Sequence, residues 1–194
     1  MEIIESIHMR DRILAEAAQR FVVHGYNGIS MREIAAACQI SKAALYYHFA
    51  DKEDLIVAIL EGYLDQIDRL ICDCRADGGM PGEQLGRVVR AIFAQAPEQR
   101  SIIRLASQEM PNLRPATRQR FGAIYQRKFI GQFVEMIQAG ITVGEFQALD
   151  PHLSAWILLG MMYPFFYPPQ ERENLATPEA IEAVLSIFFQ GIRR

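Results

Sequence analysis

Residues 30–52, which read SMREIAAACQISKAALYYHFADK, constrain the fold more than any other stretch of this chain. Ser30 followed three residues later by Glu33 is the pattern of a capping box, which predicts the start of a helix. Ser41 predicts the start of a second short helix, and Asp51 that of a third. Two short helices separated by a tight turn are typical of a helix-turn-helix, whose second helix can lie in the major groove of DNA.

The remaining sequence also predicts helices, and no stretch of it reads as a credible strand. Residues 1–8 are either a loose arm or a fraying extension of the first helix. We expect Gly25 and Gly140 to close the helices that precede them, and Pro164 to kink or end its own. The fold class is therefore all-α, with about nine helices. Outside the helix-turn-helix, the expected helices span about 9–24, 52–77, 82–95, 97–109, 115–139, 151–167 and 178–193.

Composition excludes several classes of protein. The chain has a net charge of −3, and residues 8–52 carry six cations against four carboxylates, or +2, which alone does not indicate a nucleic-acid binder. The chain has three cysteines, an odd and low number that does not predict a disulfide framework. We therefore expect the protein in a reducing cytoplasm. The longest apolar stretch, 155–167, is shorter than the roughly 20 residues that span a bilayer, so we expect no membrane segment. Catalytic and nucleotide-binding motifs are missing, so we expect no enzyme, metal or cofactor.

The run IAAACQISKAALYYHFADKEDL, residues 34–55, resembles the DNA-binding signature of the tetracycline-repressor (TetR) family. The resemblance covers roughly residues 8–56 at the level of motifs, and the rest of the chain is similar to the family only in architecture. It implies a helix-turn-helix DNA-binding domain over 1–51 and a ligand-binding and dimerisation domain over 52–194. It further implies a ligand-responsive regulator of double-stranded DNA, more often a repressor. Two recognition helices in a dimer predict a near-palindromic operator, and the aromatic residues of the C-terminal part predict a small apolar or aromatic effector.

Two positions depart from the family pattern. The turn of the motif usually holds glycine, and Gln39 stands there instead, so a residue other than glycine must adopt a positive φ at a cost of about 1–2 kcal/mol. Many members also carry a glycine where this chain has Lys42-Ala43-Ala44. Neither change removes a hydrogen-bond donor, so both bear on sequence preference.

The recognition helix offers a donor for base contacts in its first turn. Lys42 can reach guanine O6 or N7 there, and the alternative is a solvated surface lysine. Ala43, Ala44 and Tyr46 resemble the other groove-facing positions of the family. Tyr46 could instead pack in the small core of the domain.

Phosphate contacts are implied for a second group of residues. Tyr47, His48 and Lys52 match family positions that bind phosphate oxygens, although His48 could instead be a core histidine. Ser30 could combine capping with a phosphate contact, and Arg32 is similar in position to a family DNA contact. The complete expected DNA-contact set is Ser30, Arg32, Lys42, Ala43, Ala44, Tyr46, Tyr47, His48 and Lys52.

The C-terminal two thirds of the chain is rich in aromatic residues and methionine. Such residues either line an apolar ligand pocket between helices or form the core of a helical bundle. The pocket candidates are Phe93, Met110, Tyr125, Phe129, Phe133, Trp156, Met161 and Met162.

The last two helices, about 151–167 and 178–193, are apolar on more than one face. A helix that is apolar all round must be buried on more than one side. Either the two helices lie inside this chain's own core, or they pair with the same helices of a second copy in a four-helix homodimer interface.

The alternative to a DNA-binding regulator is a helical protein that binds a small molecule without regulating DNA.

Overall fold

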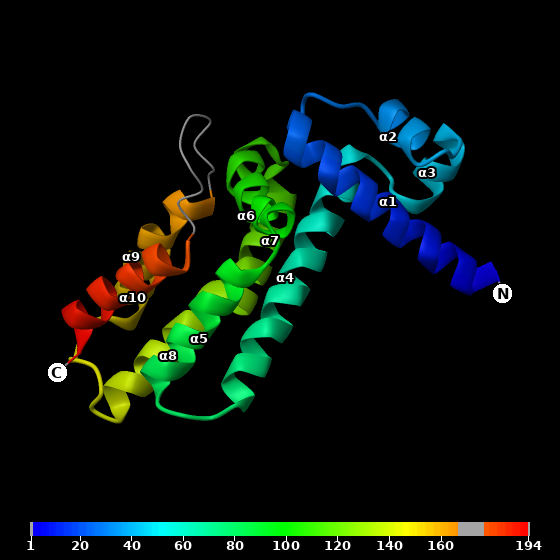
Figure 1. Cartoon of the computed structure of the whole chain (residues 1–194). Coiled ribbons are helices and arrows are strands. Elements are labelled where there is room, and N and C mark those ends of the chain that lie inside the picture. Colours follow the sequence, from blue (N-terminus) through cyan, green and yellow to red (C-terminus); the bar gives the residue numbers. More distant parts are fainter. Residues whose placement is uncertain (1, 167–176, 194) are drawn as a thin grey trace. The chain divides into compact units, whose positions relative to one another are not determined.

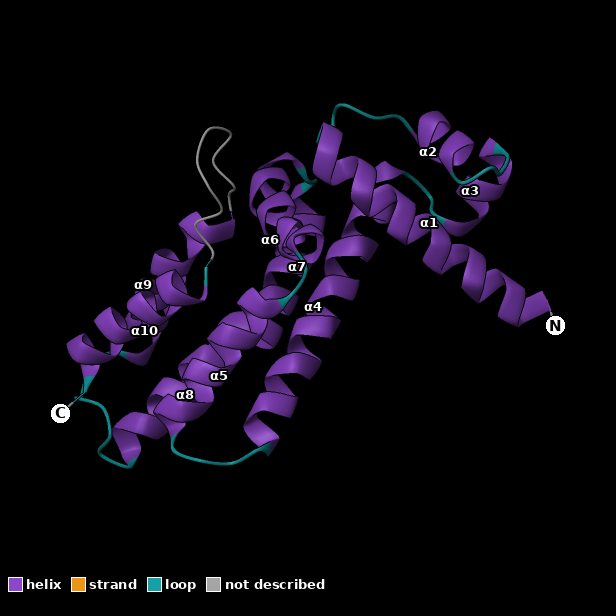
Figure 2. Ribbon diagram, in the orientation of Figure 1, coloured by secondary structure: helices purple, strands orange, loops and turns teal. Residues whose placement is uncertain are grey.

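The computed structural model describes residues 2–166 and 177–193, with side chains from His8 onward. These residues form helices joined by loops, and the described part contains no strand beyond a single antiparallel bridge between Phe146 and Arg193 (Figure 2). The prediction of an all-α fold is confirmed. No helix among the described residues is long and apolar enough to cross a membrane.

The chain forms two compact units. Unit 1 contains residues 1–63 and 101–121, and unit 2 contains residues 64–100 and 122–194. The chain passes from one unit to the other within helices α4, α6 and α7 (Figure 1). The predicted division into a DNA-binding domain over 1–51 and a ligand-binding and dimerisation domain over 52–194 stays a prediction.

Unit 1 begins with three helices and the first half of a long fourth. Their apolar faces meet in a core in which Ile13, Phe21, Leu45 and Phe49 are almost wholly buried. Residues 101–121 bring buried Leu105 and other apolar side chains to the same unit. The helices are α1 Glu2–His24, α2 Met31–Ala37, α3 Lys42–His48, α4 Lys52–Ala76, α6 Pro97–Glu109, η1 Met110–Asn112 and α7 Pro115–Tyr125.

Unit 2 is a helical bundle in which α5 packs against α8 and α10, and α8 packs against α9 (Figure 1). The segment η2 is a π-helical turn that continues α7 into α8 without a break. Counting these three as one helix gives nine helices in the described part of the chain, as predicted. The sequence did not predict the π turn. The helices are α5 Pro81–Ala94, η2 Gln126–Ile130, α8 Gly131–Thr142, α9 Pro151–Met162, η3 Tyr163–Phe166 and α10 Pro178–Ile192.

The structure corrects one predicted helix end and resolves others. The prediction that Gly140 closes its helix is wrong, because α8 continues to Thr142 and Gly144 takes the left-handed conformation with φ +78°. Gly140 is instead a packing position, since the ring of Phe146 fills the space that a Cβ would need. The first helix starts at Glu2, so the helical extension is the correct alternative for the N-terminus. As predicted, the α-helix before Pro164 ends, at Met162, and residue 167 lies outside the described part.

Candidate nucleic-acid interface and effector region

The capping box at the start of α2 is confirmed. The Ser30 hydroxyl accepts a hydrogen bond from the Glu33 backbone N–H at 3.3 Å, and Glu33 Oε2 accepts one from the Ser30 backbone N–H at 2.7 Å. The hydroxyl also donates to the same Oε2 at 2.6 Å. Hydrogen bonds from the Ser30 side chain and then its backbone lower the pKa of Glu33. The side chain of Ser30 therefore caps α2 in this structure, before any contact with DNA.

The turn between α2 and α3 has the backbone that the sequence predicts. Gln39 has φ +55°, which confirms that a residue other than glycine is held in the left-handed region. The N–H of Ile40 donates to the Ala35 carbonyl, and the N–H of Gln39 to the Ala36 carbonyl, both at 3.0 Å. These bonds form a Schellman motif that ends α2. Arg12 Nη2 from α1 donates to the Cys38 carbonyl at 2.6 Å and secures the turn from outside.

Helix α3 buries one of its seven residues and exposes four. Ser41 caps it by accepting from the Ala44 N–H at 3.0 Å, and Leu45 is its buried residue. The Tyr46 side chain is 42% exposed and that of Tyr47 is 82% exposed, so the alternative that placed Tyr46 in the core is wrong. His48 is half-buried, with its ring 5.3 Å from that of Tyr47 in an edge-on contact.

An open depression of about 460 Å³ lies where the loop before α2 meets the first turns of α3 and α4. It groups five of the nine predicted DNA contacts. The other four, Ala43, Ala44, Tyr47 and His48, are on α3 outside it. Three cations face the single carboxylate of Glu33, which is occupied by the cap, so the depression can accept an anion such as a phosphate. Its lining consists of residues 27–33, Lys42, Tyr46 and Lys52.

Lys52 is positioned by an aromatic ring that the sequence did not single out. Its Nζ lies 4.5 Å from the centroid of the Tyr26 ring, a cation–π contact that orients the ammonium group. Burial lowers the pKa of Lys52, and burial followed by the nearby carboxylates of Glu53 and Asp51 raises the pKa of Tyr26. Asn27 also lines the depression and was missed. The only signal in the sequence is that these residues form the loop directly before the capping box.

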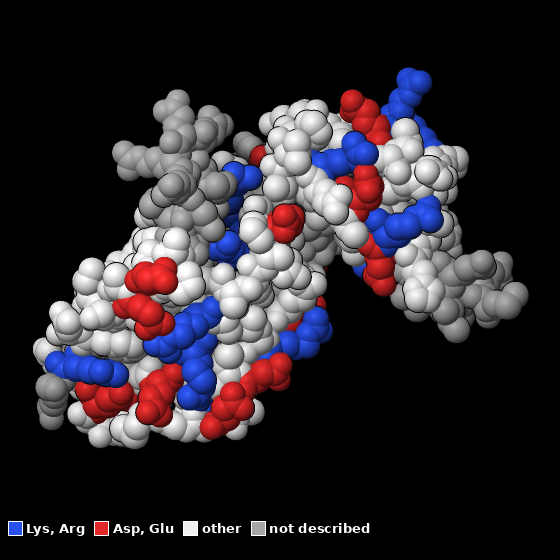
Figure 3. Space-filling model, in the orientation of Figure 1, with Lys and Arg blue, Asp and Glu red and all other residues white. Residues whose placement is uncertain are grey.

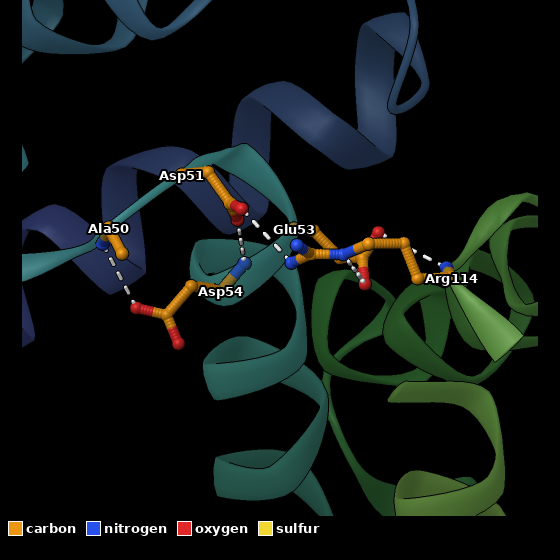
Figure 4. A network of polar contacts seen from close by, with 5 residues as sticks. All are labelled: Ala50, Asp51, Glu53, Asp54 and Arg114. Atoms are coloured by element: carbon orange, nitrogen blue, oxygen red, sulfur yellow. Dashed lines mark hydrogen bonds and ion pairs between the residues drawn. The ribbon is translucent and has the colours of Figure 1, made fainter. Parts of the chain in front are cut away.

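A charged network joins the start of α4 to the start of α7 (Figure 4). Arg114 Nε donates to Glu53 Oε1 at 2.8 Å, and its Nη2 donates to Asp51 Oδ2 at 3.0 Å. Burial raises the pKa of Glu53, but hydrogen bonds from Thr117 and Arg114 outweigh it and leave the pKa lowered. Asp51 also caps α4 as predicted, because it accepts from the Asp54 N–H at 2.7 Å.

The segment 101–121 is tied to the helix-turn-helix part of unit 1 at further points. Glu109, on α6, accepts the backbone N–H of Tyr26 at 3.1 Å. Arg120, on α7, pairs with Glu61 of α4 at 3.3 Å. Sequence reasoning missed all of these contacts, since the partners are 59 to 83 positions apart along the chain.

The predicted pocket residues do not all share one environment. Phe93, Phe129, Phe133 and Met162 are buried in unit 2, and Met161 is half-buried there. Met110 belongs to unit 1, so it lies in the other compact unit. Their assignment to a pocket stays a prediction.

Tyr125 is half-buried in unit 2 and contacts another pocket candidate. Its ring lies 5.4 Å from that of Phe129, which in turn lies 5.2 Å from that of Phe133. Burial, with a smaller contribution from Tyr163, raises the pKa of Tyr125 to about 12. A neutral phenol in an aromatic row suits an apolar environment.

Helices α9 and α10 expose apolar side chains on one face each. Leu153 is 60% exposed, Trp156 53% and Ile157 50%, and their spacing places them together on α9. Ile187 on α10 is 62% exposed. Trp156 is therefore at the surface of the single chain, although it was predicted as a pocket residue.

Charges of both signs are interspersed on the face drawn in Figure 3, and that face shows no broad field of one sign. This agrees with the mild charge of the helix-turn-helix segment. The DNA contacts of Lys42 and Lys52 stay predictions, and they would depend on placed donors.

Comparison with known proteins assigns two segments of the chain to one family. The sequence profile described as "Bacterial regulatory proteins, tetR family" matches residues 13–59, and "Tetracyclin repressor-like, C-terminal domain" matches residues 78–164. The chain is 29% identical over 143 residues to the HTH-type transcriptional repressor KstR2 of Mycobacterium tuberculosis, covering 71% of this chain and 69% of that protein. It is also 29% identical over 101 residues to the uncharacterised regulator YuxN of Bacillus subtilis, covering 52% of this chain and only 35% of that relative.

A solved structure agrees with this assignment. AibR in complex with isovaleryl coenzyme A and operator DNA superposes with a TM-score of 0.75 at 25% identity, covering 95% of this chain and 98% of that one. The two domain profiles, the repressor relatives and the shared architecture together place this chain in the TetR family of bacterial transcriptional regulators.

Proposed function

We propose that this chain is a cytoplasmic repressor that binds a near-palindromic operator as a homodimer and leaves it when a small apolar or aromatic effector binds. The observation that carries the proposal is the depression in unit 1, which gathers Arg32, Lys42, Tyr46 and Lys52 beside the exposed face of α3. AibR, a similar protein, has been solved with both an acyl coenzyme A and operator DNA, which supports the same pair of partners here.

The roles of the DNA contacts follow from their positions. Lys42 stands at the exposed first turn of α3 and reads a base edge, most simply guanine O6 and N7. Lys52 on its tyrosine support, together with Tyr47 and His48, holds phosphates and sets the register of α3 in the groove. Ala43 and Ala44 offer only methyl groups, so they allow close approach and read little.

The dimer forms through the exposed faces of α9 and α10. Leu153, Trp156, Ile157 and Ile187 form apolar surface that a single chain leaves in water, and a second copy would cover it in an isologous four-helix contact. Because Trp156 is exposed, its position favours a role in this interface and not in the effector pocket. The dimer sets the spacing of two recognition helices, which in turn requires a near-palindromic site.

The effector signal travels by helices that belong to both units. Helix α4 is one such element, and α6 and α7 are two more. The ends of α6 and α7 in unit 1 hold the helix-turn-helix through Glu109 on Tyr26 and Arg114 on Glu53. An effector can shift the equilibrium only by binding one arrangement of these helices more tightly than the other.

Gel-shift titration of the purified dimer against genomic fragments, at several salt concentrations, tests this function. We expect a specific shift whose affinity falls steeply with salt. The absence of any salt-sensitive specific shift would favour the alternative, a helical small-molecule-binding protein that does not regulate DNA.

A further inference from the structure

Three charged side chains are nearly inaccessible within the described residues, and two of them have partners. Glu53 pairs with Arg114, and Glu109 accepts from the Tyr26 N–H and from Asn112 Nδ2 at 2.8 Å. The third is Arg100, in unit 2, which is 8% exposed. No ion pair between described residues includes it, and its Nε has no hydrogen-bond partner there.

The position of Arg100 on its helix makes the missing partner more costly. It is the fourth residue of α6, so its positive charge lies at the end of the helix that favours negative charge. The side chain is turned inward, whereas Pro97, Glu98 and Gln99 before it are exposed. Glu98 in the same turn is exposed and forms no ion pair with Arg100, so among the described residues this buried cation at a helix N-terminus has no anion beside it.

One aromatic ring, that of Phe93, lies beside the guanidinium but does not neutralise it. Its Cζ lies 5.9 Å from the centroid of Phe93, near the outer limit of a cation–π contact. Phe93 stacks on Phe166 at 4.9 Å and meets Phe165 edge-on at 6.1 Å. The rings therefore offer an apolar surface, while the charge and the Nε hydrogen-bonding site of Arg100 have no partner in the described part of the chain.

We propose that the effector of this protein is an organic anion whose carboxylate, sulfonate or phosphate pairs with Arg100 while its apolar part contacts the Phe93 and Phe166 rings. A planar guanidinium suits such groups because it can donate two parallel hydrogen bonds to them. The proposal rests on the proposed effector-binding function of unit 2, and it narrows the apolar or aromatic effector to an acidic one.

Two fluorescent probes with the same ring system test this pairing. 1-Anilinonaphthalene-8-sulfonate carries a sulfonate, and N-phenyl-1-naphthylamine lacks it. We expect the Arg100→Met variant of the full-length protein to bind the sulfonate probe at least about tenfold more weakly than wild type, or about 1.4 kcal/mol. Its affinity for the neutral probe should change less than about threefold, because the rings remain in place.

Further variants separate charge from packing. Arg69→Met removes an exposed arginine from the same unit and should bind both probes as wild type does. Arg100→Lys keeps a cation and should retain most of the affinity for the sulfonate probe, whereas Arg100→Gln should repeat the loss. The unliganded Arg100→Met protein should also melt at a higher temperature than wild type, since a buried unpaired charge is gone.

Three results would overturn the proposal. The first is equal sulfonate-probe affinity in wild type and Arg100→Met, and the second is an equal loss of both probes in that variant. The third is no binding of the sulfonate probe to wild type at all. Gel shifts on the same samples keep the two claims apart: lost operator binding in wild type would remove the repressor function but leave the probe result standing.

Discussion

Helices α3 and α9 each have an exposed face in the single chain, but the two faces have opposite chemistry. The accessible side chains of α3 include an ammonium group and two phenols, from Lys42, Tyr46 and Tyr47. Those of α9 include Leu153 and Trp156, which have no charge to hold them in water. Polar side chains can stay in water until DNA binds. Apolar side chains are more stable when another protein surface covers them.

The comparison extends to the buried charges of the two units. In unit 1 each buried carboxylate is paired with a donor, such as Glu53 with Arg114. In unit 2 the buried Arg100 has no partner among the described residues. Paired charges hold a domain in one arrangement, and the unpaired one is the feature on which the proposed effector site rests.

The largest expected effect lies on the apolar side of the comparison. The double variant Trp156→Glu with Ile187→Glu places charges on the exposed faces of α9 and α10. We expect the dimer dissociation constant to rise at least about a hundredfold, or about 2.7 kcal/mol, because charges would be buried without partners. Sedimentation measures the dimer, and gel shift should show operator affinity falling with it.

Val143→Glu is the matched control for that variant. Val143 is 59% exposed at the end of α8, outside the two helices, so the same chemical change should leave the dimer intact. A dimer that survives the double variant unchanged would remove α9 and α10 from the interface.

On the polar side, Lys42→Ala and Lys52→Ala should fail in different ways. Loss of Lys42 should cost about 1–3 kcal/mol on the preferred operator and relax the preference at one base. Loss of Lys52 should weaken binding to all sequences alike and reduce the salt slope by about one. Gel shifts on matched and altered operators at several salt concentrations separate the two.

An exposed cation of unit 2, removed by Arg69→Ala, controls for bulk charge and should leave operator affinity unchanged. Equal losses from both lysine variants on every sequence would show that neither reads a base.

The network around Glu53 gives a smaller and pH-dependent effect. Its pKa in the folded protein is lowered, so the carboxylate stabilises the fold at neutral pH, and this contribution is lost as pH falls below about 4.3. We expect Glu53→Gln to lower the free energy of unfolding by about 1–2 kcal/mol at pH 7. The difference from wild type should shrink at pH 4, as followed by urea unfolding and circular dichroism.

Glu135→Gln removes the exposed half of an ion pair with Arg75, in which the Glu135 side chain is 64% exposed, and should change stability by less than about 1 kcal/mol. Equal free energies of unfolding for Glu53→Gln and Glu135→Gln would contradict the stabilising role of Glu53. So would a difference between wild type and Glu53→Gln that grows at low pH.

The smallest effect concerns the turn between α2 and α3. Gln39→Gly should stabilise unit 1 by about 1 kcal/mol, because glycine adopts the observed φ of +55° without strain. Gln138→Gly, on the exposed face of α8, should instead destabilise by about 0.5–1 kcal/mol. Thermal unfolding of both variants checks the sign, and a destabilising Gln39→Gly would mean that the glutamine side chain has contacts worth more than the strain.

The polar surface was more predictable than the pocket. Five of the nine predicted DNA contacts surround one depression, because one short motif places them on neighbouring turns. The support of Lys52 by Tyr26 was missed, since a ring contact between a loop and a helix 26 positions later has no local signal. Trp156 and Met110 were grouped with the pocket by composition alone, which does not distinguish a core residue from an exposed one.

The sequence by itself determined where several helices start, and it predicted which short helix faces DNA. Caps at Ser30, Ser41 and Asp150 act on N–H groups three residues away, so local order suffices to predict them. Only the tertiary structure decided that Gly140 makes room for Phe146 and that Arg100 is buried without a partner among the described residues. Those outcomes depend on which helices pack together, and burial and pairing across a packed core are properties of all the contacting segments at once.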